Sequence, residues 1–405
     1  MTVCMRTALT VVSANLCLLI VPAPLFAQQQ ATSNAFNPAI SLILDGRYGL
    51  FSNDPEDYRL PGFQLGGESG PGTESFNLGE SELVASANID DRFYGSFTAA
   101  LHSENGETHV ELEEAYLETI GLGHGFTIRA GRFFSQLGYL NNIHLHAQDF
   151  VDLPLVYRAM FGGQFNEDGV QIRWLAPTLT FIELGLEIGG GNDFPTSRGS
   201  GSIGSAVGTL TFGGDIGVSH SWQLGLSYLH ASVNDRTGGI HPEDNPVESS
   251  FTGDDHIPGI DLVYKWAPRG NATERNFKFQ AEYFHRNEDG AITLVDAPGI
   301  STLDGRQSGW YAQGVYQFIR RWRVGLRYDQ LDADNDGSNP TALAAGGFGD
   351  QGYTPRRYSA MVDYSYSEFS RFRLQYNHDE SYPDTDDEIF AQFIVSLGAH
   401  RAHTF

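Results

Sequence analysis

The residues of this sequence whose types and spacing best suit metal chemistry are histidines. They form two closely spaced pairs: His144 with His146, and His400 with His403. Asp149 and Asp152 follow the first pair. Imidazole binds Zn²⁺ well when two or three ligands converge, and each pair has a spacing that lets both rings meet one ion. We expect either solvated or interfacial histidines or a zinc site at the first pair.

A second segment suits Ca²⁺. Asp332, Asp334 and Asp336 occupy positions 1, 3 and 5 of a calcium-loop pattern, and Gly337 follows at position 6. The twelfth position is Leu343, where such loops have a bidentate Glu. We expect either a weak calcium site in an external loop or a solvated acidic loop. No metal or other cofactor is required by the sequence.

Charged residues that would line a pore form a larger set. They lie on the polar face of predicted strands or next to it: Arg47, Glu80, Glu82, Glu114, Glu118, Arg129, Arg173, Glu183, Arg323, Arg327, Asp363 and Arg373. Facing rows of acidic and basic side chains create a transverse field that orients polar solutes and sets ion preference. The alternative is a polar interior whose charges neutralise one another without selectivity.

Other classes of function are disfavoured. A formal net charge of -25 argues against nucleic acid, because neutralising phosphates requires a basic face. The sequence contains no nucleophile motif, P-loop or dinucleotide fingerprint, so we expect no enzyme.

The candidate residues depend on β-strands for their positions. Near the C-terminus Ile389, Ala391, Phe393, Val395 and Leu397 lie on one face of an alternating segment. The same alternation recurs in about sixteen segments of roughly ten residues, the length a tilted strand needs to cross a bilayer. The predicted fold is all-β: a single antiparallel transmembrane barrel of about 16 strands with long external loops and short periplasmic turns.

The tryptophans support this interpretation. Trp174, Trp222, Trp266 and Trp322 fall on the apolar face at predicted periplasmic strand ends, and Trp310 falls at a predicted external end. Aromatic girdles at the two membrane interfaces produce this distribution.

The N-terminus is expected to be an export signal. Residues 1–27 have a positive start, an apolar stretch and a small residue at the cut. Residues 28–36 would form a short periplasmic lead, and residues 37–405 the barrel. Cys4 and Cys17 both lie in the signal, so the mature chain is expected to have no disulfide.

The longest irregular segment, residues 133–168, is too long for a passive turn. Its apolar content at residues 153–157 and 161–165 favours burial over exposure to water. We predict that it folds into the barrel and narrows the pore. The alternative is packing over the external rim.

The sequence also resembles known families. Residues 112–117, 129–133 and 167–171 look like phosphate-selective-type porins. Residues 144–147 and 397–403 are similar to a little-studied family labelled zinc-regulated, TonB-dependent outer-membrane receptors, although we expect no N-terminal plug domain here. A final strand followed by the terminal Phe405 resembles the signal that the barrel-assembly machinery reads in Gram-negative outer membranes.

The resemblance and the patterns imply a protein of the Gram-negative outer membrane. Its expected partners are outer-membrane lipid and lipopolysaccharide, the barrel-assembly machinery through Phe405, and two further copies in a homotrimer. The predicted function is passive diffusion of ions or small solutes. The alternative is a receptor or uptake protein for a metal such as zinc.

Overall fold

The structure is a computed structural model, and it describes residues 38–66, 69–104, 107–197, 203–238, 247–295, 297–349, 352–382 and 384–398. The predicted signal, the His400–His403 pair and Phe405 lie outside these residues.

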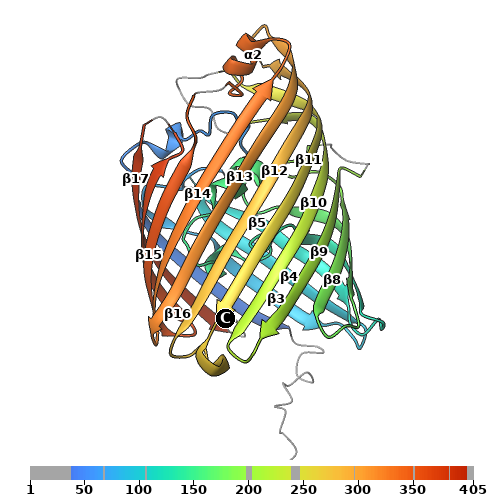
Figure 1. Cartoon of the computed structure of the whole chain (residues 1–405), viewed down its shortest axis with the longest axis vertical. Coiled ribbons are helices and arrows are strands. Elements are labelled where there is room, and N and C mark those ends of the chain that lie inside the picture. The colour runs from blue at the N-terminus through green and yellow to red at the C-terminus, as the bar shows by residue number, and fades with distance from the viewer. Residues whose placement is uncertain are drawn as a thin grey trace, which may run out of the picture.

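The described chain forms one closed antiparallel sheet (Figure 1). The strands are β1 Ala39–Leu50, β2 Ser75–Leu78, β3 Ser81–Asn88, β4 Phe93–Glu104, β5 Glu107–Thr119, β6 Phe126–Phe134, β7 Asn166–Leu175, β8 Phe181–Gly189, β9 Ser205–Ile216, β10 His220–Thr237, β11 Ser249–Trp266, β12 Asn276–Leu294, β13 Ile300–Ile319, β14 Trp322–Asp336, β15 Arg356–Ser367, β16 Ser370–Glu380 and β17 Asp386–Gly398. Apart from β2 and β3, which do not pair with each other, the strands pair with their neighbours in sequence, and pairing of β1 with β17 closes the wall.

The wall has sixteen strand positions. β2 and β3 both pair with β1 and are separated by Gly79 and Glu80, so together they fill one position. The predicted all-β barrel of 16 strands is therefore confirmed.

The two-residue alternation dictates which side of the wall each residue occupies. On β14, Val324 and Leu326 are exposed on the outer surface, whereas Arg327 is buried on the inner side. This is the reverse of a soluble sheet, and it is the pattern of a wall that faces lipid outside and a polar lumen inside. Closure also removes free sheet edges, whose unpaired backbone groups could not be satisfied in lipid.

The connections differ at the two ends of the barrel. The first residues of β1 pair with the last residues of β17, so both ends of the described chain lie at one end of the barrel. Short turns at this end include 217–219, 320–321 and 368–369. Short turns mark the periplasmic side of such barrels, and we name the end accordingly.

The strands β10 to β14 extend further at the opposite, external end (Figure 1). Residues 286–309 lack the alternation of the other strands, yet they are not a long loop. The strands β12 and β13 continue to Leu294 and from Ile300, so their connection is residues 295–299. Beyond the membrane the outer face needs no apolar residues, and the alternation that marks a strand is lost there.

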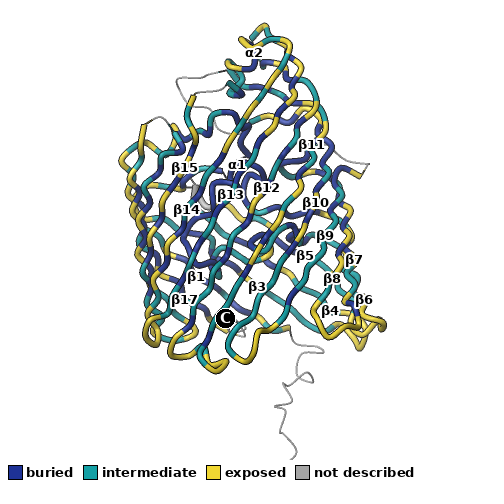
Figure 2. The backbone as a smooth tube through the Cα atoms, in the orientation of Figure 1, coloured by how far each residue is buried: buried dark blue, intermediate teal, exposed yellow. Residues whose placement is uncertain are grey.

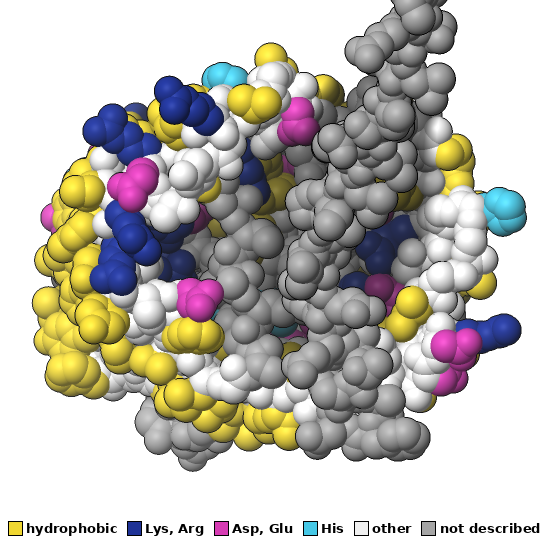
Figure 3. All heavy atoms as spheres, turned by 90° about the horizontal axis from the view of Figure 1, so that it is seen from below, with side chains coloured by type: hydrophobic (Ala, Val, Ile, Leu, Met, Phe, Trp, Pro, Cys, Tyr) yellow, Lys and Arg dark blue, Asp and Glu magenta, His cyan; other side chains and the backbone are white. Residues whose placement is uncertain are grey.

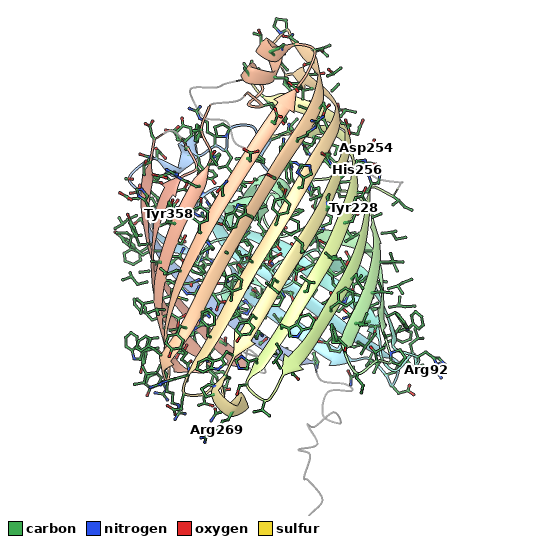
Figure 4. All side chains as sticks on the ribbon, in the orientation of Figure 1. Arg92, Tyr228, Asp254, His256, Arg269 and Tyr358 are labelled. Carbon is green, nitrogen blue, oxygen red and sulfur yellow. The ribbon has the colours of Figure 1, made fainter. Side chains whose placement is uncertain are left out.

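Aromatic residues form belts on the outer surface. Trp174, Trp222, Trp266 and Trp322 lie at or near the periplasmic ends of β7, β10, β11 and β14, as predicted. Trp310 lies in the middle of the 20-residue β13 and not at a strand end, because β13 begins at Ile300. Its ring centroid lies 5.2 Å from that of Tyr328, and the ring centroids of Tyr328 and Tyr358 are 5.0 Å apart. Figure 4 labels Tyr228 and Tyr358 on the outer wall.

The helices of the described chain are short. They are η1 Pro55–Asp57, η2 Leu145–Ala147, α1 Leu155–Phe161, η3 Pro268–Gly270 and α2 Pro340–Ala345. In the part of the chain that the structure describes, no helix has the length and apolar character needed to cross a membrane.

The hydrophobic core lies inside the barrel rather than between layers. Two segments enter the lumen, residues 58–65 and the connection between β6 and β7, and their apolar side chains pack on the wall residues Leu229, Phe284 and Leu331. Figure 2 shows the buried helix α1 within the wall of strands. The lumen is therefore substantially filled.

Candidate functional site

The constriction of the lumen is the connection between β6 and β7, here named the inward loop (residues 135–165). All seven residues of its helix α1 are buried, and α1 contacts β12, β13 and β14. The helix starts after Pro154 and ends at Gly162, whose φ of 68° lies in the left-handed region that favours glycine. The prediction that this segment folds into the barrel is confirmed.

Asp152 holds the middle of the inward loop to the wall. Its carboxylate pairs with Arg327 and Arg357 at 2.8 Å each and with Arg158 at 3.1 Å. Burial disfavours the charged carboxylate, but the three arginines outweigh it and hold the pKa of Asp152 well below its usual range. Asp152 is thus a buried anion compensated by several cations.

Asp149 makes a second attachment of the same kind. It pairs with Lys278 on β12 and, at 2.9 Å, with Arg323 on β14. Burial again opposes ionisation, and the two cations lower the pKa of Asp149 nonetheless. Asp149 and Asp152, which follow the histidine pair in sequence, are thus bound by arginines and a lysine.

Glu282 on β12 binds the first part of the inward loop through hydrogen bonds. It accepts hydrogen bonds from the backbone N–H groups of Tyr139 at 3.1 Å and Leu140 at 2.9 Å. The hydroxyl of Tyr157 donates to the same carboxylate at 2.9 Å. The loop is thereby attached to the wall through both backbone and side chains.

The predicted pore-lining residues lie on the inner side, but most are paired along the wall. Arg47 pairs with Asp45 at 2.6 Å, and Arg129 and Arg173 both reach Glu118 at 2.8 Å. The field across the lumen is correspondingly reduced at these positions.

The other predicted residues contact the inward loop, line the periplasmic hollow described below or, in the case of Glu80, lie between two strands. Arg323 and Arg373 contact Asp363 at 2.5 and 3.7 Å, and Arg323 also holds Asp149. Glu183 lines the periplasmic hollow. Glu80 lies between β2 and β3, outside both strands.

Glu82 and Glu114 belong to a cluster with the loop histidines. His144 Nδ1 lies 3.3 Å from Glu82 Oε2, and His144 Nε2 lies 3.3 Å from Glu114 Oε2. His146 Nδ1 contacts the other oxygen of Glu82. Burial disfavours the imidazolium, but the surrounding carboxylates outweigh it and hold the pKa of His144 well above its usual range.

Glu113 is a cluster member that the alternation hides. Thr98 pairs with Glu114 but Ala99 pairs with Leu112, so Glu113 is the extra residue of a β-bulge in β5. The bulge turns two consecutive carboxylates, Glu113 and Glu114, to the buried side. A break in the spacing of the outward apolar residues, from Leu112 to Leu117, is the signal in the sequence.

The aspartates of the calcium pattern are not in a loop, and that part of the prediction is wrong. Asp332, Asp334 and Asp336 lie on β14, on alternate positions that are all exposed. Alternate residues of a strand are about 6.6–6.8 Å apart along it and do not wrap around one ion. Calcium binding itself stays a prediction.

A basic vestibule occupies the periplasmic end of the lumen. This hollow of about 1090 Å³ is bounded on one side by the inward loop and elsewhere by the wall and the periplasmic turns. Its basic lining residues are Lys265, Lys278, Arg320, Arg321, Arg323 and Arg371. Its acidic lining residues are Asp149, Glu183 and Glu368. Figure 3 shows Lys and Arg side chains around the opening at this end.

Of the charged residues that line the vestibule, only Arg323 and Glu183 are predicted as pore-lining by the sequence. The chain has two lysines, Lys265 and Lys278, and both line this hollow in a protein of net charge -25. The concentration of these two rare lysines at facing strand ends is the signal in the sequence that points to the vestibule.

Comparison with solved structures gives the class of this fold. An anion-selective porin from Comamonas acidovorans has a TM-score of 0.52 at 9% identity, covering 89% of this chain and 99% of that one. A trimer form of OmpT, an outer-membrane protein of Vibrio cholerae, has a TM-score of 0.51 at 9% identity with the same coverage. The chain has the fold of an outer-membrane porin-like 16-stranded barrel.

Comparison of sequences gives the family. No family model matches the chain. It is 32% identical over 408 residues to an uncharacterised protein of Aquifex aeolicus, covering 92% of this chain and 81% of the relative. The chain belongs to the same family as that protein.

Proposed function

We propose that the protein is an outer-membrane channel for passive diffusion of small ions and polar solutes. The observation that carries the proposal is the inward loop, which is held across the lumen by Asp149, Asp152 and Glu282 and is bounded below by a charged vestibule. A constriction inside a wide barrel, followed by a polar hollow, is the arrangement of a size-selective pore.

The charge of the vestibule favours anions. Six basic and three acidic side chains line it, and several of the basic ones lie in or near the periplasmic turns. A rim of one sign attracts ions of the other sign and raises their local concentration. We therefore propose small anionic solutes as the preferred class, although the exposed loops at the external end carry many acids.

The proposal includes the surroundings of the barrel. The exposed apolar wall requires lipid, with lipopolysaccharide in the outer leaflet. Residues 1–27 would direct export and be removed, residues 28–36 would remain as a short lead, and Phe405 would be read by the barrel-assembly machinery. Three copies would associate, as one structural neighbour is described as a trimer.

A second candidate function is uptake of a metal such as zinc. The observation that favours it is the cluster of His144 and His146 with Glu82 and Glu114 in the lumen. A receptor of this kind would bind the metal without letting other small solutes pass.

Liposome swelling with solutes of graded size distinguishes the two. The channel predicts rapid swelling with small sugars and amino acids and a sharp decline with larger solutes. Liposomes that hold folded protein but stay impermeable to all of these solutes would contradict the channel and leave the uptake function.

A further inference from the structure

Three buried ligand atoms from three separate segments converge on one point beside the inward loop. Glu82 on β3, Glu113 on β5 and His144 on the inward loop each offer one ligand atom, and these atoms lie within 4.8 Å of one another. The atoms that approach one another are Oε2 of Glu82, Oε2 of Glu113 and Nδ1 of His144. Glu82 is fully buried, and Glu113 is 6% exposed. None of the three atoms has a hydrogen-bond partner among the described residues. Buried polar atoms without a partner are costly, and an unrecognised ion is one of their ordinary explanations.

The distances fit a small tetrahedral ion. His144 Nδ1 lies 3.3 Å from Glu82 Oε2 and 3.4 Å from Glu113 Oε2. Two ligands of tetrahedral Zn²⁺ lie about 3.3–3.5 Å apart, since Zn–N and Zn–O bonds are about 2.0–2.2 Å long. The two measured separations are thus close to edges of a zinc tetrahedron and too long for strong hydrogen bonds.

Neighbouring side chains orient the three ligands as the surroundings of a metal usually do. Glu114 Oε2 lies 3.3 Å from the second ring nitrogen of His144, so a carboxylate, an imidazole and the candidate ion would lie in series. His146 contacts the second oxygen of Glu82. The ring of Phe134 packs edge-on against His144 at 5.3 Å. These contacts point Nδ1 of His144 and one oxygen of Glu82 toward the common point.

The carboxylates around the point favour a cation there. Among the described residues, the ion-pair partners within 4.0 Å of Glu82, Glu113 and Glu114 are His144 and His146 alone. Even a protonated His144 leaves these three carboxylates in excess. A borderline-soft divalent ion matches one imidazole and two carboxylates better than Ca²⁺ or Mg²⁺, which prefer oxygen ligands throughout.

We propose that Glu82, Glu113 and His144 bind one divalent ion of the Zn²⁺ class and that this ion links the inward loop to β3 and β5. Three protein ligands leave the fourth tetrahedral position to water. The ion binds neutral imidazole, so binding releases the proton from His144. The site does not depend on the proposed channel function, because a closed barrel would hold the ion equally well.

The first test is zinc binding by the purified, untagged full chain in detergent. Dialysis followed by elemental analysis should give one tightly bound Zn²⁺ per chain. His144→Ala and Glu113→Gln should each weaken binding at least 100-fold. His146→Ala, which removes a neighbour of Glu82 and no ligand, should weaken it about 10–100-fold. The matched control, His220→Ala at the periplasmic rim, should bind as the wild type does.

The second test needs no variant. X-ray absorption of the zinc-loaded wild type should show one imidazole among light-atom ligands at about 2.0–2.2 Å. Zinc should also slow amide hydrogen exchange in residues 135–150, and chelation should reverse this change. Failure to bind Zn²⁺ stoichiometrically, or equal binding by the His144→Ala variant with its barrel folded, would show an ion-paired histidine only. Binding that leaves exchange in the inward loop unchanged would overturn the link to the wall.

Discussion

Asp152 is the carboxylate on which three buried arginines converge. Arg158 belongs to the inward loop, whereas Arg327 and Arg357 belong to β14 and β15, so the pairs join loop and wall. A buried ion pair contributes modestly as a pair, but removing one partner leaves the other charges uncompensated. We therefore expect the ion pairs of Asp152 to hold the inward loop in its position.

Asp152→Asn should destabilise the loop attachment by about 3–5 kcal/mol, because it leaves buried guanidinium groups without their anion. Urea unfolding followed by gel mobility measures the change. Asp304→Asn is the matched control, since Asp304 forms an exposed pair with Arg306, and it should cost less than about 1 kcal/mol. Equal effects of the two substitutions would refute the role of Asp152.

The lowered pKa of Asp152 gives this contribution a definite pH range. The unfolded carboxyl titrates near pH 3.9, and the folded one titrates at lower pH. The contribution is therefore fully present above the unfolded pKa and is lost as pH falls through the folded pKa. The stability difference between wild type and Asp152→Asn should be constant from about pH 5 to about pH 7, which lies above the unfolded pKa, and should shrink below about pH 4.

Under the proposed channel function, the inward loop is the element expected to set permeability. It carries its own helix, and its apolar residues share one core with the wall. Replacing residues 138–162 by a short Gly/Ser linker should preserve the barrel, because strand pairing does not pass through this segment. The variant should admit larger solutes in liposome swelling and show a several-fold higher conductance. A folded variant with an unchanged size limit would mean that the constriction lies elsewhere.

The sequence predicted the membrane-spanning parts of the strands well and the external extensions of β12 and β13 poorly. The alternation of Val324, Leu326 and Arg327 is set by the membrane on one side of the wall, so it is visible in β14 itself. The extension of β12 and β13 lies beyond that environment and leaves no such pattern.

The candidate site could be predicted from the sequence only in part, because the partners of its residues come from distant strands. His144 and His146 were recognisable by type, but their partner Glu113 is placed by a bulge that shifts the register. Asp149 and Asp152 lie close to the histidines in sequence but bind other residues. Their actual partners, such as Lys278 and Arg357, come from strands more than a hundred residues away.

At the scale of the whole molecule, charge is distributed unevenly. The chain has a net charge of -25, yet the periplasmic vestibule is lined mainly by basic side chains. Arg320 and Arg321 in the turn between β13 and β14 belong to this lining, whereas Arg92 and Arg269 project from the same end outside it (Figure 4). Arg320 and Arg321 therefore carry the same charge as Arg92 and Arg269 but differ from them in position relative to the vestibule.

Arg320→Glu with Arg321→Glu should therefore shift ion preference from anions toward cations, because it reverses charge inside the vestibule. The reversal potential in a salt gradient measures this preference. Arg92→Glu with Arg269→Glu makes the same change in net charge and should leave the reversal potential nearly unchanged. Equal shifts from both double variants would indicate a general surface effect and contradict the vestibule.

The most direct test of the central claim is single-channel recording of the purified wild-type protein in a planar bilayer. A passive pore narrowed by the inward loop predicts discrete open steps without any energy source, and a reversal potential that favours anions. A folded, inserted barrel that gives no open steps across the same bilayer would contradict the account.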